Sequence, residues 1–153
     1  MSGFVDANIF LRLLARDDPA KTQACLALFQ RARRGDVELH TSEAIIAEVI
    51  YVLLSPKVYA RSRTEIAAGL GAVIGIRGVH VPEKTAVLAA IDQWQQHQKL
   101  DFADCLAIAH ALRAHGGNVY SYDRAVGRVD GIQRLEPELD QDRPLSPVPT
   151  VPR

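Results

Sequence analysis

The stretch from Leu100 to Leu112 places two carboxylates at the start of a run that is otherwise apolar or small. Asp101 and Asp104 are spaced i, i+3, so on a helix they share one face of the first turn, where the helix dipole stabilises anions. The apolar residues that follow are too continuous for a solvated surface helix and predict a helix packed into an α/β core. A carboxylate at the mouth of a buried helix needs compensation by a cation, by hydrogen-bond donors or by a metal ion.

Three other acids stand at comparable positions. Asp6 and Asp123 each end a short apolar stretch that reads as a strand, and Glu48 lies in the middle of a helix-like segment that is apolar nearly all round. The carboxyl edge of an open α/β sheet, where strand-ending acids lie, is the edge at which ligands bind. Taken singly, the two strand-ending acids have an ordinary interpretation as helix caps, and Glu48 as the partner of an arginine.

The four acids taken together predict a metal site. Like charges that converge on one place repel each other unless a divalent cation lies between them. Hard oxygen ligands in that number suit Mg²⁺ or Mn²⁺ rather than Zn²⁺. Such a metal would lower the pKa of a bound water and offset phosphate charge, which is the chemistry of phosphodiester hydrolysis.

Short strands and helices alternate along the chain, and this alternation predicts a parallel sheet covered by helices on both faces. We therefore expect an α/β fold, a three-layer α/β/α sandwich on a parallel sheet of four or five strands. The predicted strands are Gly3–Asp6, Val37–Thr41, Val79–Val81, Asn118–Asp123 and Ile132–Leu135. The predicted helices are Ala7–Leu14, Ala20–Arg34, Glu43–Leu54, Arg63–Ile76, a segment from Pro82 through Trp94 and the stretch that opens at Asp101.

Length and composition bound the function. A chain of 153 residues is one domain, which we place at residues 1–136, followed at 137–153 by a proline-rich tail that we expect to be poorly ordered. Eighteen basic and eighteen acidic residues give no net charge, which weighs against constitutive tight binding of nucleic acid but leaves room for a local basic rim. With no signal peptide or membrane span, Cys25 and Cys105 are expected to be buried, reduced thiols of a cytoplasmic protein.

Four stretches of the chain resemble a known family. They are Phe4–Leu14 with the Asp-Asp-Pro of residues 17–19 after it, Thr41–Leu53, Asp101–Leu106 and Val119–Asp123. In order and spacing they are similar to the four motifs of PIN-domain ribonucleases, and most of all to the VapC-type toxins of bacterial toxin–antitoxin pairs. The resemblance implies a Mg²⁺- or Mn²⁺-dependent endoribonuclease that acts on RNA, forms a homodimer and is inhibited by a partner antitoxin.

The resemblance also implies roles for single residues. The acidic quartet of the family falls on Asp6, Glu48, Asp104 and Asp123, of which the first and third are the best candidates for direct metal coordination. Three residues take auxiliary places: Asn8 as a hydrogen-bond partner of a site carboxylate, Asp101 as a water-mediated ligand or simply a helix cap, and Ser121 as a hydroxyl where many members carry threonine. Arg12 holds a substrate phosphate or pairs with Asp17 or Asp18.

Several alternatives stay open at this point. The chain could be a PIN-like nuclease of RNA processing without an antitoxin, or a non-catalytic RNA- or protein-binding module, although the presence of all four acids argues against the latter. A phosphatase-like hydrolase is disfavoured because Asn8 stands where such enzymes carry a second aspartate. Among other residues, His110 is expected to be structural, and Trp94 and Tyr51 to lie in the core or at a dimer interface.

Overall fold

A computed structural model describes residues 1–139, 146–147, 149 and 152. Its strands are β1 (Ser2–Phe4), β2 (Glu38–His40), β3 (Val79–His80), β4 (Asn118–Tyr120) and β5 (Gln133–Leu135). Its helices are α1 (Ala7–Ala15), α2 (Pro19–Arg34), α3 (Glu43–Leu54), α4 (Arg63–Ile74), α5 (Lys84–Gln96) and α6 (Phe102–Ala114), with a short 3₁₀ turn at Val126–Arg128. The expectation of a poorly ordered tail falls mostly outside the described residues.

The helix ends lie where the sequence signals place them. Asp18 caps α2 by accepting from the backbone N–H of Lys21, and Pro19 occupies the first turn, where its missing N–H is not needed. Ser42 caps α3 through the N–H of Ile45. Gly35 ends α2 with a φ of 85°, a conformation that glycine adopts without strain.

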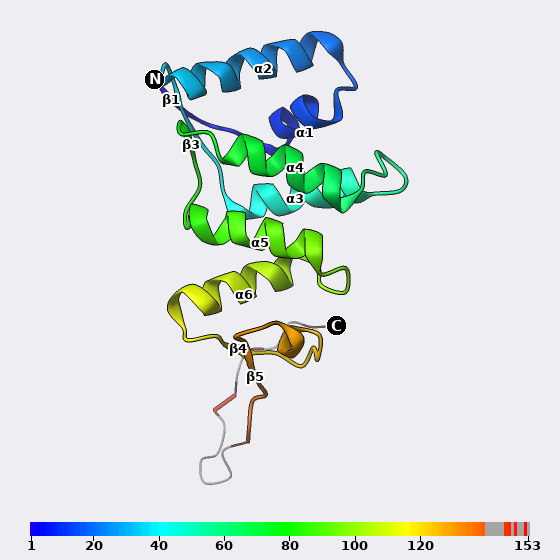
Figure 1. The fold of residues 1–153 in the computed structure, drawn as a ribbon, viewed down its shortest axis with the longest axis vertical. Helices are drawn as coiled ribbons and strands as arrows, with labels where there is room; N and C mark the ends of the chain where they lie inside the picture. Colours follow the sequence, from blue (N-terminus) through cyan, green and yellow to red (C-terminus); the bar gives the residue numbers. More distant parts are fainter. Residues whose placement is uncertain (140–145, 148, 150–151, 153) are drawn as a thin grey trace.

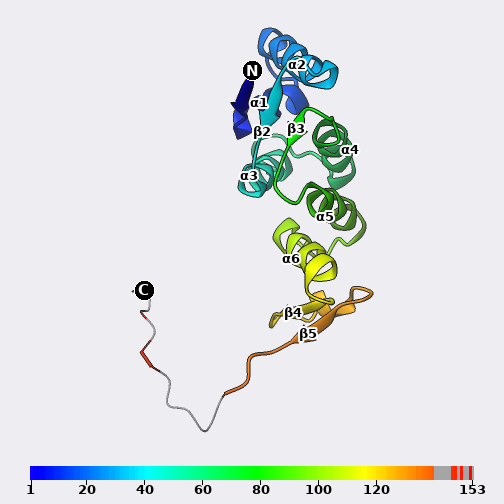
Figure 2. The same cartoon turned by 90° about the vertical axis from the view of Figure 1, so that its left-hand side faces the viewer.

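All strand pairings are parallel, which confirms the predicted α/β class. The five strands are nevertheless divided between two sheets: one has the order β1-β2-β3, and the other consists of β4 and β5. In both views β4 and β5 lie beyond α6, at the opposite end of the molecule from α2 and well away from β1 (Figures 1 and 2). The expected single sheet of four or five strands is therefore not continuous within one copy of the chain.

The hydrophobic core is built mainly from side chains of the helices. Phe10 of α1 and Phe29 of α2 pack with their ring centroids 5.6 Å apart, and both are buried. Trp94 of α5, 1% exposed, meets Phe102 of α6 edge to face, as expected of a core tryptophan. Cys25 and Cys105 are free and buried, as predicted.

One arginine ties the α5–α6 connection to α4. Arg63, the first residue of α4, donates from Nη1 to the carbonyl oxygens of Trp94, His97 and Leu100 at 2.9, 3.0 and 2.7 Å. Its guanidinium also lies 4.9 Å from the centroid of the Trp94 ring, within the range of a cation–π contact. This one side chain thereby fixes the turn from which α6 departs.

Among the described residues, no helix combines the length and the apolar character that crossing a membrane requires.

Candidate active site

Asp6 stands at the junction of β1 and α1. Its side chain caps α1 by accepting from the N–H of Ile9 at 3.4 Å, and the carboxylate is exposed. The preceding Val5 is 4% exposed, and its carbonyl accepts a hydrogen bond from the buried hydroxyl of Thr41 at the end of β2. Asp6 is therefore held at the carboxyl edge of the first sheet, as predicted.

Glu48 lies in the middle of α3, but it is exposed rather than buried. The buried face of α3 consists of Ile46, Val49, Ile50 and Leu53. Glu48 and Tyr51 lie on the opposite face, and Tyr51 is 77% exposed. The expectation of a buried Glu48 was wrong because a helix with apolar residues nearly all round still leaves one stripe uncovered when its neighbours pack on one side. Of the two places expected for Tyr51, the core is excluded, and the dimer interface stays a prediction.

Asp101 and Asp104 form a reciprocal cap at the start of α6. Asp101 accepts from the N–H of Asp104 at 2.8 Å, and Asp104 accepts from the N–H of Asp101 at 3.1 Å. Burial raises the pKa of the Asp104 carboxyl above its ordinary value. The hydrogen bond from the Asp101 N–H lowers this pKa, and the negative charges of Asp101 and Asp123 raise it further. A half-buried carboxylate that neighbouring carboxylates repel is destabilised by a repulsion that a cation would remove.

Asp123 closes the turn after β4. Its N–H donates to the hydroxyl of Ser121 at 3.0 Å, and its carboxylate accepts from the N–H of Ala125 at 2.8 Å. Ser121 thus orients the aspartate through the backbone, and Asp123 is exposed. Helix α6 packs against β4, and the negative charge of Asp123 adds to the rise in the pKa of Asp104.

The comparisons with known proteins bear on these four acids. Residues 3–132 match the PIN domain family. This chain is a PIN-domain protein of the VapC type. Over 132 residues, 86% of this chain and 97% of the relative, it is 30% identical both to VapC ribonuclease Mb1869c of Mycobacterium bovis and to Ribonuclease VapC13 of Mycobacterium tuberculosis.

Within one copy of this PIN domain the four acids fall into two groups. Asp6 and Glu48 belong to the part built on β1, β2 and β3, where α1 packs on α3. Asp104 and Asp123 belong to the part built on α6, β4 and β5, which lies apart from the first sheet (Figure 2). Across the described residues, no three aspartate, glutamate, histidine or cysteine side chains come together as metal ligands. The donor types suit a hard cation, but among the described residues of one copy the four acids do not form one ligand cluster.

The remaining predicted site residues of the PIN domain have local partners or are exposed. Arg12 pairs with Asp17 at 2.7 Å, which favours the structural alternative over the phosphate. The Nε2 of His110 donates a 2.7 Å hydrogen bond to the Glu43 carboxylate of α3, the structural role expected of it. Asn8 is exposed, and in the part of the chain that the structure describes it makes no hydrogen bond to a carboxylate.

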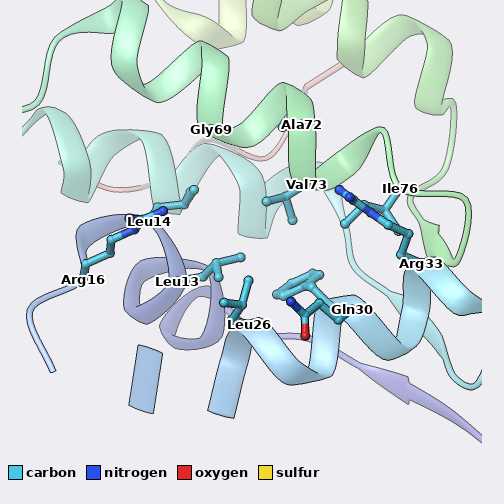
Figure 3. Close-up of a pocket in the computed structure, with 11 residues that line it drawn as sticks. Leu13, Leu14, Arg16, Leu26, Gln30, Arg33, Gly69, Ala72, Val73 and Ile76 are labelled. Carbon is cyan, nitrogen blue, oxygen red and sulfur yellow. The ribbon is translucent and has the colours of Figure 1, made fainter. Parts of the chain in front are cut away.

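A groove that the sequence did not reveal lies away from the acids of this PIN domain. A cavity of about 350 Å³ opens between α1, α2 and α4, with Leu13, Leu26 and Val73 along its floor and Arg16 and Arg33 at its rim (Figure 3). Leu26 is 42% exposed. The signal in the sequence is only that Leu26 and Gln30 share a helix face, which many surface helices show.

Proposed function

We propose that the chain is an endoribonuclease, the toxin component of a toxin–antitoxin pair, which hydrolyses phosphodiester bonds of RNA. The observation that carries this proposal is the similarity to two VapC ribonucleases over almost their whole length. The match to the PIN domain family, over residues 3–132, includes all four acids. The chemistry of the side chains agrees with it, because four carboxylates from distant segments are a donor set for a hard divalent cation and not for a covalent mechanism.

The catalytic residues in this proposal are Asp6, Glu48, Asp104 and Asp123, which would hold Mg²⁺ or Mn²⁺. Such a cation supplies a Lewis acid for the phosphate and lowers the pKa of a bound water. In this chain the reciprocal cap with Asp101 fixes the Asp104 carboxylate, and the Ser121 hydroxyl fixes the turn that carries Asp123. Both supports act before substrate arrives, so the ligands are oriented in advance.

The proposal extends to partners and to organisation. An RNA substrate, an antitoxin protein and a second copy of the chain are the partners, and the location is the cytoplasm. The apolar groove between α1, α2 and α4 offers the antitoxin an uncovered hydrophobic surface. Residues 1–136 form the nuclease domain and 137–153 a tail outside it.

The decisive experiment measures cleavage of a panel of RNAs by the purified protein during titration with Mg²⁺ and with Mn²⁺. Activity that requires the metal and disappears in the Asp6→Asn and Asp104→Asn variants supports the proposal. Asp36→Asn is the matched control, because Asp36 is an exposed acid that, within the described part of the chain, pairs with Arg34 alone. Cleavage that survives in either site variant, after repurification, would refute the assigned mechanism, and inhibition by a co-purified small protein would separate a toxin from an RNA-processing nuclease.

A further inference from the structure

Strand β1 lacks a neighbour on one side. It pairs in parallel with β2 through Ser2↔Glu38, Gly3↔Leu39 and Phe4↔His40, and no other described strand pairs with it. Its three residues are all exposed, with Phe4 at 65%. Its free edge presents unpaired backbone N–H and C=O groups, which are a template for another strand.

Strand β4 also lacks a neighbouring strand, among those described, on one of its edges. It pairs in parallel with β5 from Asn118↔Gln133 to Tyr120↔Leu135, and its other edge meets no strand in the described part of the chain. Two aromatic residues at its end, Tyr120 and Tyr122, are 71% and 73% exposed. Two parallel edges, each flanked by exposed aromatic side chains, are therefore left open.

The positions of the acids indicate that these two edges belong together. Asp6 follows the carboxyl end of β1, and Asp123 follows the carboxyl end of β4. If β4 lies parallel to β1, both carboxylates stand at the same edge of one sheet, which is where ligands of α/β folds bind. Asp104 comes with Asp123, since α6 packs against β4 in the same unit. A junction of β3 with β5 would instead put β1 and β4 at opposite edges of the sheet, with Asp6 far from Asp123.

The chain's own β4 is held away from its β1. Arg63 fixes the turn before α6 through three carbonyl oxygens, and Phe102 is buried against Trp94. Further along α6, His110 bonds Glu43 of α3, and Arg113 pairs with Glu83 ahead of α5 at 2.9 Å. Swinging α6, β4 and β5 onto the β1 of the same copy would break these contacts, whereas a second copy can meet the edge without breaking any.

We propose that two copies of the chain exchange their β4–β5 units, so that each acidic site combines Asp6 and Glu48 of one copy with Asp104 and Asp123 of the other. This inference rests on the proposed function of those four residues. It accounts for the absence of a metal-ligand cluster among the described residues of a single copy. The exchanged pair has one continuous five-stranded sheet at each end, in the order β3-β2-β1 followed by β4-β5 of the partner.

The exposed side chains supply much of the area such a pair needs. Phe4, Tyr120 and Tyr122 expose between 65% and 73% of their surface. Covering these parts of six rings, three from each copy, removes on the order of 800 Å² from water. A stable interface buries about 1,600 Å² in total, and the paired backbones and the exposed Leu112 add to the ring area.

A cross-linking experiment tests the exchange without any need for enzymatic activity. The double variant Phe4→Cys/Tyr120→Cys is treated with a short bis-maleimide and analysed by denaturing electrophoresis. The two native cysteines are 6% and 0% exposed, so the wild-type protein is the unreactive control. Exchange predicts a covalent dimer, whereas an internally cross-linked monomer or no product would overturn the proposal. Light scattering of the unmodified chain, 16.8 kDa per copy, gives an independent reading: a monomer at micromolar concentration would also overturn it.

A complementation experiment tests the shared site directly. Asp6→Asn and Asp123→Asn chains, each inactive alone, are unfolded and refolded together in equal amounts. Exchange leaves one intact site in each mixed dimer, so about a quarter of the wild-type activity returns. No recovery would overturn the exchange. As the matched control, wild type is refolded with an equal amount of the Asp6→Asn/Asp123→Asn double variant and compared with pure wild type at the same total protein concentration. Its activity is then about a quarter if sites are shared and about half if each copy is self-contained.

The two experiments separate the inference from the function. If the wild-type protein cleaves no RNA at any metal concentration, the proposed function fails, and the cross-linked dimer still reports the exchange. If the wild type is active but neither dimer nor complementation is found, the exchange fails and the proposed function stands.

Discussion

Replacement of Arg63 by alanine tests the structural reasoning most directly. The guanidinium donates to three carbonyl oxygens within 3.0 Å and lies over the ring of Trp94. A hydrogen bond from a charged donor contributes about 1.5–3 kcal/mol, and the cation–π contact about 0.5–1 kcal/mol. The carbonyls lie in a half-exposed turn, where water replaces part of what is lost. We therefore expect Arg63→Ala to lower the free energy of unfolding by about 2–4 kcal/mol, well below the simple sum.

The measurement is urea unfolding followed by fluorescence. The chain has one tryptophan, Trp94, and it is 1% exposed, so its emission reports the packing that Arg63 supports. A loss of this size lowers the melting temperature of a chain of this length by about 4–16 °C. Arg63→Lys keeps the charge but cannot present the planar fork, and it is expected to fall between alanine and wild type.

The control is Arg61→Ala. Arg61 lies two residues away, is exposed and makes a single bond to the carbonyl of Ala15 at 3.2 Å. We expect it to change the free energy of unfolding by less than about 1 kcal/mol. Equal effects of the two alanine variants would refute the argument that Arg63 holds the turn before α6.

Three further predictions concern stability. Asp17 accepts hydrogen bonds from Tyr59 and from Arg12, and these bonds hold the pKa of its carboxyl below the ordinary value. Their stabilisation of the fold is complete at pH values above the ordinary pKa and is lost as the pH falls through the lowered pKa. Asp17→Asn should therefore flatten the fall in melting temperature between about pH 5 and pH 3. Gly78→Ala places a Cβ 2.3 Å from the carbonyl oxygen of Ala32 and should destabilise the chain by at least about 2 kcal/mol. Gly71→Ala places its Cβ in open space within α4 and should stabilise the chain by about 0.5–1 kcal/mol. The two variants are compared by the midpoints of their denaturant unfolding curves. Asp104→Asn removes a half-buried charge that desolvation and neighbouring carboxylates disfavour, and it should raise the melting temperature in metal-free buffer. A fall in the melting temperature would contradict the assigned repulsion.

The elements of the fold were predictable because their signals are local. Capping residues such as Asp18 and Ser42 bond to N–H groups two or three residues away, and an apolar stripe repeats within one helix. All six helices and all five predicted strands are present, with ends within a few residues of the expected ones. The capping interpretation of Asp101 could be foreseen for the same reason.

The assembly of the site was not predictable from the same signals. Whether β1 has a second neighbour depends on contacts between residues far apart in the sequence, which no local pattern encodes. The exposure of Glu48 depends likewise on which face of α3 its neighbours cover. The four acids could be picked out one by one because each is odd in its own segment, but their separation into two groups emerges only from the placement of α6.

The free edge of β1 also determines how association must end. Two copies that each receive the other's β4–β5 unit satisfy both open edges at once, and a closed two-fold pair results. If a copy instead gives its unit to one neighbour and receives from another, the same contacts repeat without limit and produce a growing fibre. Which product forms depends on whether both exchanges occur between the same two molecules, so concentrated refolding should favour polymers and dilute refolding the closed pair.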